Sequence, residues 1–398
     1  MGGTHRRLDM LAQALGAVSD SLAVLLLVRT ESRYTETERC QYETYLSARW
    51  GTRISLTLSS VREPPGFDNR WKDLAAGIFR FDRSFRFRQL DNPQANAAVA
   101  SAFAEHPQIV LLHRLEAMSV FLRLPKNASA GAHVFFDLDD VEHLSTFRRL
   151  LREPSWPAER FQILQVPAIM AGERRAIKRA DVTFVCSQKD KKYLETMFGK
   201  GRIHVVPNPA AVSDTPMPQT SDRVVMYIGV FEYPPNVHAA DRLVKSVWPL
   251  VRAAVPDAKL FIVGKHPEKI PAFSSSGADG SVSFTGFVDD IAACYAKARV
   301  VCCPIRVGAG TRVKIIEAAA FARPVVSTPL GAEGLEFRDN TEIVLRERDE
   351  DLAAACAELL VDDERARRIG IAAWERARAV YDRAAVFRML QELFRPHA

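Results

Sequence analysis

The sequence predicts an α/β protein built from two successive domains, each with a parallel sheet. In the second half, six short apolar runs alternate with segments of helical periodicity, the pattern of a parallel sheet covered by helices. In the first half, apolar runs and helical segments alternate less regularly. A stretch rich in Pro, Ser and Thr at 210–222 separates the two halves. A chain of 398 residues of which 47% are hydrophobic is long enough for two cores.

These patterns give the expected domain boundaries. We expect a first domain over residues 1–209, a linker at 210–222 and a second domain over 223–375. Residues 376–398 have apolar positions at helical spacing, so we expect a C-terminal helix that packs back on the first domain.

The first half opens with apolar residues at helical spacing and continues with short buried strands. Its expected strands are 21–28, 54–58, 108–113, 133–140, 181–187 and 203–206. Its further helices are expected at 36–49, 144–180 and 189–198. A segment at 79–88, FRFDRSFRFR, alternates aromatic and basic residues. Two interpretations remain open for it: contact with lipid headgroups or a long acidic acceptor, or an edge segment with a solvated basic face.

The second half is more regular. Its expected strands are 224–230, 259–264, 282–287, 299–305, 324–327 and 342–345. Its expected helices are 237–255, 289–298, 311–322 and 350–360. Ligands of such sheets bind beyond the carboxyl ends of the strands, so we expect the loops there to carry the chemistry.

One unit of the second half points to an anionic ligand. A buried strand at 300–303 is followed by a loop of small residues at 308–311, for which Thr311 is the expected helix N-cap. Arg312 and Lys314 fall in the first helical turn, where the helix dipole disfavours cations unless an anion lies between them and the free N–H groups. A diphosphate fits there, and Glu317 suits ribose hydroxyls. The alternative is a structural glycine turn with solvated charges.

Composition narrows the class of partner and compartment. The formal charge of +6 suits the binding of an anionic nucleotide or of an anionic membrane surface. Such a charge is also common among proteins encoded by arginine-rich genomes. No recognised nucleic-acid-binding module is present, so we expect no nucleic-acid partner. The six cysteines show no CxxC spacing, no apolar run is long enough to span a bilayer, and no signal peptide opens the chain. We expect a cytoplasmic protein in peripheral contact with the inner face of an anionic membrane.

Taken in order, the motifs resemble GT-B glycosyltransferases, specifically family 4 enzymes of the bacterial polysaccharide type. The matching motifs are GxFxYxPN at 229–236, LFIVG at 260–264, FTGFVDD at 284–290, GxGTxxKxxEAxA at 308–320, PVVST at 324–328 and, in the first half, DLDDVE at 137–142. The resemblance implies two Rossmann-like domains that face each other across a cleft. It also implies transfer of a sugar from a nucleotide-sugar donor to a glycan or lipid-linked acceptor in cell-surface polysaccharide synthesis, with retention, without a metal and without another cofactor.

The resemblance also assigns roles. The expected catalytic residues are Asp140, Lys314 and Glu317. Glu317 matches the glutamate that holds the donor ribose, Lys314 matches a basic residue near the diphosphate, and Asp140 ends the strand at whose end relatives often have a histidine near the transferred sugar. The residues expected to bind the donor are Gly229, Gly264, Lys265, Phe287, Val288, Arg306, Gly308, Gly310, Thr311 and Arg312. The residues expected on the acceptor side are Gly2, Gly3, Arg114, Asp139 and Glu142.

The chain departs from the family pattern at several places. Ala309 stands where many relatives have a second glutamate, and Val230 and Asn236 stand near an Arg-and-Lys pair of relatives. Relatives often have a histidine where this chain has Asp139 and Asp140. Relatives also begin with a strand before a Gly-Gly loop, so the first strand of the N-terminal domain is expected to be missing here.

Three alternatives remain open. A DxD at Asp137-Leu138-Asp139 could hold Mg²⁺ or Mn²⁺, as in GT-A transferases. A nucleotide-sugar 2-epimerase would share the fold and the cleft. A catalytically inactive partner protein that kept the fold is the alternative outside enzymes, and Ala309 and the missing strand favour it.

Overall fold

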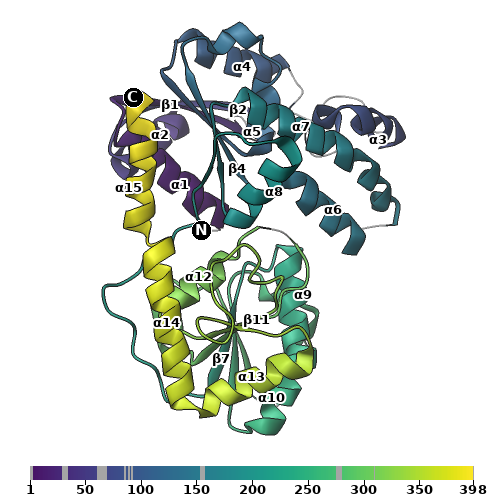
Figure 1. Cartoon of the computed structure of the whole chain (residues 1–398), viewed down its shortest axis with the longest axis vertical. Helices are drawn as coiled ribbons and strands as arrows, with labels where there is room; N and C mark the ends of the chain where they lie inside the picture. Colours follow the sequence, from purple (N-terminus) through teal and green to yellow (C-terminus); the bar gives the residue numbers. More distant parts are fainter. Residues whose placement is uncertain are drawn as a thin grey trace. The chain divides into compact units, whose positions relative to one another are not determined.

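The structure is a computed structural model that describes residues 3–28, 35–60, 70–84, 87, 90, 93–152, 157–274, 280–308 and 310–397. The chain divides into two compact units (Figure 1). Unit 1 comprises Gly3–Val206 and Phe387–Ala398, and unit 2 comprises Pro207–Val386. Each unit is an α/β structure with parallel strands, as the sequence predicts.

Unit 2 contains one parallel sheet of six strands in the order β12-β11-β10-β7-β8-β9. The strands are β7 (Val224–Ile228), β8 (Lys259–Val263), β9 (Val282–Gly286), β10 (Val300–Cys303), β11 (Val325–Ser327) and β12 (Val344–Leu345). The helices are α9 (Pro234–Arg242), α10 (Trp248–Ala254), α11 (Ile291–Lys297), α12 (Val313–Ala320), α13 (Asp349–Val361) and α14 (Asp363–Tyr381). A π-helical turn, Leu243–Val247, joins α9 to α10, so the helix predicted at 237–255 is continuous but widened at that turn.

The core of unit 2 explains why its strands could be predicted. All four residues of β10 are buried, and the strands beside it are almost as apolar, because helices cover both faces of the sheet. A strand buried on both faces is an uninterrupted apolar run, which the sequence displays directly.

Unit 1 differs from the prediction of one sheet per half, because its strands form two separate sheets. β1 (Ser21–Val28) pairs in parallel with β2 (Arg53–Ser60) alone. β3 (Ile109–His113), β4 (His133–Asp139), β5 (Val182–Val185) and β6 (Ile203–Val205) form the second sheet in that order. Among the described residues no strand joins β1 to β3, and the first described element is α1 (Gly3–Gly16).

The remaining helices of unit 1 surround these sheets. They are α2 (Glu36–Trp50), α3 (Arg70–Phe79), α4 (Pro93–Ala104), α5 (Arg114–Phe121), α6 (Glu142–Arg152), α7 (Val166–Arg179) and α8 (Gln188–Phe198). A 3-10 helix, η4 (Pro157–Gln165), lies between α6 and α7, so the helical region predicted at 144–180 is not one helix. Within the described part of the chain, no helix is both long and apolar enough to span a membrane.

The chain ends in α15 (Arg383–Phe394) and a 3-10 turn, Arg395–His397. The Phe394 ring is fully buried and meets Phe135 of β4 edge-on, with ring centroids 4.9 Å apart. His397 stacks on His133, with ring centroids 3.5 Å apart. Phe394 is therefore part of the core of unit 1.

The described residues of the aromatic and basic segment at 79–88 lie in helices, in a turn and in the links between them. Phe79 ends α3, and a 3-10 helix, Phe81–Arg83, follows it. Phe81 and Phe87 are buried, because both rings pack into the core of unit 1. Residues 85, 86 and 88 lie outside the described residues.

Candidate functional site

The glycine loop of unit 2 connects β10 to α12, as predicted. Gly308 and Gly310 adopt φ values of 97° and 80°, a left-handed conformation that favours glycine. α12 begins at Val313 with Arg312 as its N-cap, so the predicted capping role of Thr311 is wrong. The reason is a different partner: the Thr311 hydroxyl accepts a hydrogen bond of 2.8 Å from the Asn208 amide. Ala309 lies outside the described residues.

Lys314 lies in the first turn of α12 and is held by side chains from β7 and α9. Its Nζ donates to the Tyr227 hydroxyl at 2.9 Å and to Asn236 Oδ1 at 2.8 Å, and it lies 4.2 Å from the centroid of the Tyr227 ring. Burial lowers the pKa of Lys314 to about 8, and the neighbouring Arg312 guanidinium acts in the same direction. An anion close to this lysine would therefore bind more tightly when the lysine is protonated.

Glu317 lies one turn further along α12. Its Oε2 accepts a hydrogen bond of 3.2 Å from the hydroxyl of Tyr295, a fully buried residue of α11. The Tyr295 ring is itself fixed by stacking on Phe321, with ring centroids 4.5 Å apart. Because Tyr295 donates to the carboxylate, it limits the rotamers of Glu317 and orients it on the helix surface.

Two glycines let the loops after β7 and β8 approach each other closely. Gly264 has a φ of 137°, and a Cβ there would lie only 1.7 Å from the carbonyl oxygen of Gly229. Any side chain at position 264 would therefore push the two loops apart. The loops lie at the carboxyl ends of neighbouring strands, where parallel sheets bind ligands.

The other predicted donor residues of unit 2 are distributed around these loops. Lys265 Nζ lies 4.7 Å from the centroid of the Phe287 ring, which is 59% exposed. Val288 packs partly against the core. Arg306 hydrogen bonds to the backbone carbonyl of Glu347 and forms an ion pair with its carboxylate at 3.6 Å. Arg306 therefore already has an anionic partner, which a phosphate would have to replace.

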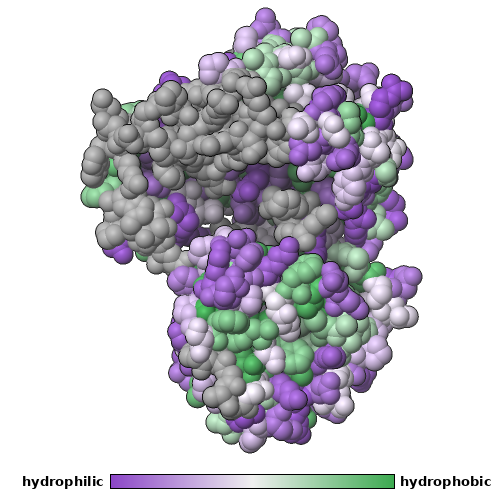
Figure 2. All heavy atoms as spheres, turned by 180° about the vertical axis from the view of Figure 1, so that it is seen from behind, coloured by the Kyte–Doolittle hydropathy of each residue, from purple (hydrophilic) through white to green (hydrophobic). Residues whose placement is uncertain are grey.

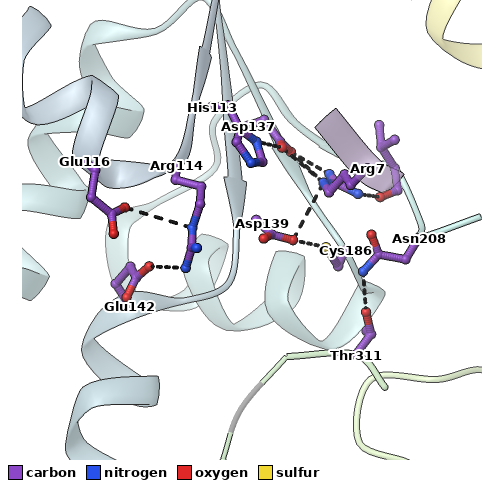
Figure 3. Close-up of polar contacts among 11 residues, drawn as sticks. Arg7, His113, Arg114, Glu116, Asp137, Asp139, Glu142, Cys186, Asn208 and Thr311 are labelled. Carbon is purple, nitrogen blue, oxygen red and sulfur yellow. Dashed lines mark hydrogen bonds and ion pairs between the residues drawn. The ribbon is translucent and has the colours of Figure 1, made fainter. Parts of the chain in front are cut away.

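In unit 1, a buried polar cluster gathers where β3, β4 and β5 end (Figure 3). The Asp137 carboxylate accepts hydrogen bonds from Arg7 Nε at 3.0 Å and Nη2 at 2.5 Å, and both side chains are fully buried. Arg7 also donates to the carbonyl oxygen of Val206 at 2.7 Å. Burial by itself would raise the pKa of Asp137, but the Arg7 charge and the hydrogen bond with His113 lower it to about 2.

His113 is a functional candidate that the sequence analysis missed. Its Nδ1 lies 2.7 Å from Asp137 Oδ2, while its Nε2 is buried and has no hydrogen-bond partner among the described residues. A carboxylate on Nδ1 fixes the imidazole with Nε2 available to a hydroxyl group. One signal was present in the sequence: His113 is the last residue of a predicted buried strand, at the carboxyl end where ligands bind.

The structure places the predicted acceptor-side residues beside this cluster. Arg114 follows His113 with a left-handed φ of 68° and donates to Glu142 at 3.2 Å, and Asp139 has a φ of 61°. Such backbone conformations cost energy in residues with side chains and are concentrated at functional sites. Asp140 is partly exposed at the same strand end. Gly3 begins α1, and Gly2 lies outside the described residues.

The side chains of the DxD do not fit a metal site. Both oxygens of Asp137 accept hydrogen bonds from the buried Arg7, and Asp139 Oδ1 lies 3.8 Å from the same guanidinium. A divalent cation would have to displace a buried arginine. Among the described residues, no three His, Cys, Asp or Glu side chains are grouped so as to hold a metal ion.

Comparison with known protein families finds a match for a large part of unit 2. Residues 222–362 match a family model described as glycosyl transferases group 1. The matched segment contains the glycine loop, Lys314 and Glu317. No protein with a curated description matches the chain in sequence.

Solved structures resemble the chain over most of its length. HepE of Anabaena, solved with UDP and glucose, has a TM-score of 0.64 at 14% identity, and the match covers 99% of this chain and 96% of that one. Sucrose-phosphate synthase of Thermosynechococcus elongatus has a TM-score of 0.64 at 16% identity, with coverage of 95% and 99%. The chain has the GT-B fold.

A third similar structure belongs to a longer chain. A point mutant of TarM from S. aureus was solved with fondaparinux, α-GlcNAc-glycerol and UDP. It has a TM-score of 0.59 at 15% identity; the match covers 76% of this chain and only 59% of TarM.

Proposed function

We propose that the protein is a glycosyltransferase of the family 4 type, which moves a sugar from a nucleotide-sugar donor to a glycan or lipid-linked acceptor. The observation that carries the proposal is the unit of glycine loop and α12, with Lys314 and Glu317 on its first two turns, inside the segment that matches glycosyl transferases group 1. UDP is the first nucleotide to test, because the HepE and TarM structures contain it.

The residues of unit 2 suit a nucleoside diphosphate. The loop leads into the start of α12, where the first N–H groups of a helix have no partner within it, Lys314 supplies a positive charge, and Glu317 would accept from ribose hydroxyls. These groups would stabilise the negative charge that develops on the leaving diphosphate, the role that a metal plays in other transferases. We therefore propose a reaction that needs no metal and no other cofactor. The resemblance to family 4 enzymes leads us to propose also that it retains the anomeric configuration.

The residues of unit 1 suit a sugar. His113, with its Nδ1 next to Asp137, offers Nε2 to a hydroxyl, and Arg114 and Glu142 present further polar groups beside it. We assign this cluster to sugar recognition. The proposed lipid-linked acceptor belongs to cell-surface polysaccharide synthesis and implies peripheral contact with an anionic membrane.

A thermal-shift screen tests the donor site. The protein is heated with UDP, GDP, ADP, CMP or dTDP, with and without EDTA, because a ligand that binds only the folded state raises the melting temperature. We expect a shift with UDP that EDTA does not change. A shift that EDTA abolishes would contradict the metal-free mechanism, and no shift with any nucleotide would favour the inactive partner protein.

The role of His113 is tested by its replacement with alanine. We expect His113→Ala to lower kcat/KM for sugar transfer about 100-fold, the order of effect of a positioned proton-transfer or hydrogen-bonding group. The UDP-induced thermal shift should stay unchanged, because the nucleotide binds unit 2. His204→Ala, at an exposed position of β6, is the control. Equal kcat/KM in both variants would remove His113 from the site.

A further inference from the structure

Lys314 differs from the other lysines of unit 2 in its surroundings. Figure 2 shows hydrophilic residues spread over the surface of that unit. Five of the six lysines of the unit are exposed: Lys245, Lys259, Lys265, Lys269 and Lys297. Lys314 is partly buried, and burial lowers its pKa. A buried ammonium group costs free energy unless it has hydrogen-bond acceptors or a counter-charge. The groups that contact its Nζ therefore decide whether Lys314 stays charged.

Two neutral side chains hold the ammonium group of Lys314. Asn236 Oδ1 accepts a hydrogen bond from Nζ at 2.8 Å, and the Tyr227 hydroxyl accepts another at 2.9 Å. Within the described part of the chain, Nζ contacts only these two groups and the face of the Tyr227 ring, and no acid pairs with it. An ammonium group has three N–H donors, so one donor remains for a ligand. Neutral acceptors stabilise the charge without cancelling it, so the charge stays available to an anion.

Other titratable groups act on Lys314 through their charge. Glu317 raises the pKa of Lys314, and Arg312, the N-cap of α12, lowers it. The Cys303 thiol of β10 is close enough to act as well, but burial raises the pKa of that thiol and keeps it neutral at pH 7. The Tyr227 hydroxyl of β7 is also neutral, because burial raises its pKa. A titration near pH 8 in this group of side chains therefore belongs to Lys314.

The amide of Asn236 is fixed with its oxygen toward Lys314. Asn236 is the third residue of α9 and does not titrate. Its Nδ2 donates to the carbonyl oxygen of Val230 at 2.9 Å, which leaves Oδ1 as the atom that meets the ammonium group. A Cβ at Gly229 would lie 3.1 Å from Cγ and Nδ2 of Asn236, so this glycine lets the amide pack against the loop after β7. Asn236 therefore joins that loop to α12.

We propose that Asn236 is a positioning residue, which holds the ammonium group of Lys314 in place for the diphosphate of the donor. In the family pattern, an Arg-and-Lys pair follows the first strand of this domain, near the positions of Val230 and Asn236. In this chain the lysine comes from α12, and α9 supplies the amide that holds it. The inference rests on the proposed function, because it takes the diphosphate site of unit 2 as given.

Two substitutions of Asn236 distinguish a residue that holds Lys314 from one that only fills space. Asn236→Ala removes an acceptor from the charged form, so the pKa of Lys314 should fall by about one unit. Asn236→Asp keeps the size and an acceptor oxygen but adds a negative charge, so the pKa should rise by at least about one unit. The loss of packing alone would not shift the pKa in opposite directions in the two variants.

An NMR titration of the full chain measures the pKa of Lys314 without any nucleotide. The protein is labelled with ¹³C at the lysine Cε atoms, Lys314→Arg identifies the signal of Lys314, and the exposed Lys297 is the internal reference. His238→Ala is the matched control, because His238 is exposed two residues further along α9, and side chains at that spacing do not face each other. The control should leave the midpoint at about 8.

Calorimetric titration with UDP, between about pH 6 and pH 9, extends the test to the donor site. Asn236→Ala should lose its affinity about one pH unit earlier than the unmutated protein, so that it binds UDP about fivefold more weakly at pH 8. Asn236→Asp should bind UDP about tenfold more weakly at pH 7, because its carboxylate cancels the charge of Lys314. His238→Ala should bind UDP as the unmutated protein does.

The two measurements separate the possible outcomes. Each variant is first checked for an unchanged melting temperature, and Asn236→Asp, which has nearly the shape of the original side chain, carries the test if Asn236→Ala does not fold. Unchanged pKa values of Lys314 in the variants would overturn the proposal. Shifted pKa values with the same UDP affinity in all variants would also overturn it, because the lysine would then be held for another purpose. If the unmutated protein binds no nucleotide, the proposed function is wrong and the role at the diphosphate is wrong with it, whereas the NMR shifts still decide whether Asn236 holds Lys314.

Discussion

The two units place charged groups at the ends of their strands in different ways. In unit 2, Lys314 and Glu317 project from one helix, and their neighbours Tyr227 and Tyr295 are neutral. In unit 1, Asp137 and Arg7 form an ion pair that is fully buried, and His113 joins it. The comparison teaches that a ligand site can be built in one local segment or assembled from distant ones. Only the local kind leaves a compact motif in the sequence.

The largest expected effect concerns the buried pair of unit 1. Asp137→Asn removes the carboxylate that hydrogen bonds to the buried Arg7 guanidinium and leaves only Asp139, 3.8 Å away, so we expect the free energy of unfolding to fall by about 3–5 kcal/mol. Urea denaturation measures it. Asp257→Asn removes an exposed ion pair with Arg223, which solvent screens, so it should lower the free energy of unfolding far less. Similar decreases in the free energy of unfolding of the two variants would contradict the expected difference between buried and exposed charges.

The corresponding test of unit 2 targets Glu317. Glu317→Ala should weaken nucleotide binding about 100-fold, because two hydrogen bonds from ribose to a carboxylate are lost at about 1.5 kcal/mol each. The melting temperature without ligand should hardly change, since the carboxylate is partly exposed. Calorimetric titration with UDP measures the affinity, and Glu375→Ala on the exposed side of α14 is the control. Unfolding of the variant, or unchanged affinity, would contradict the assigned role.

Lys314 gives unit 2 a pH dependence that can sharpen the comparison. Because the pKa of Lys314 is lowered to about 8, the side chain is mostly cationic at pH 7 and loses its charge as the pH rises through that value. We expect the affinity for UDP to be constant below about pH 7 and to fall about tenfold by pH 9. Lys314→Arg keeps its charge, so its affinity should not change over that range. A flat profile for the unmutated protein would remove Lys314 from the diphosphate site.

The smallest expected effect comes from replacing Tyr295, whose hydroxyl hydrogen bonds to Glu317. Tyr295→Phe removes the hydroxyl that orients Glu317 while the ring still stacks on Phe321. We expect KM for the donor to rise about fivefold, in line with a net hydrogen bond of about 1 kcal/mol, with kcat hardly changed. Tyr193→Phe, in the other unit, serves as the control. A fall in kcat alone would show that Tyr295 acts on a later step than donor binding.

The sequence predicted unit 2 more completely than unit 1, for a physical reason. Strands such as β10 are buried on both faces and therefore stand out as apolar runs, and the glycine loop, Lys314 and Glu317 lie close together along the chain. The prediction that Thr311 caps α12 was wrong, because its hydroxyl bonds to Asn208, far earlier in the chain. No local pattern carries that information.

In unit 1, the strands were predictable but their assembly was not. The strand at 108–113 and the DLDD motif were recognised, yet nothing near Asp137 in the sequence shows that Arg7 lies against it. The same holds for the division into two sheets, which depends on which strands pair rather than on which segments are strands. His113 was missed although it ends a predicted strand, because a lone histidine is not a motif.

Phe394 packs against Phe135 and Phe184, with ring centroids 4.9 Å and 6.0 Å apart, and this has a consequence for synthesis of the chain. Unit 2 is continuous from Pro207 to Val386, so all of its residues leave the ribosome before the last helix is complete. Unit 1 is complete only after Phe387–Ala398 have been synthesised, although most of its residues are synthesised before those of unit 2. Domains generally fold as units while the chain is synthesised. Unit 1 is therefore begun first but completed last, and Phe135 and Phe184 lack the packing of Phe394 while unit 2 is being synthesised.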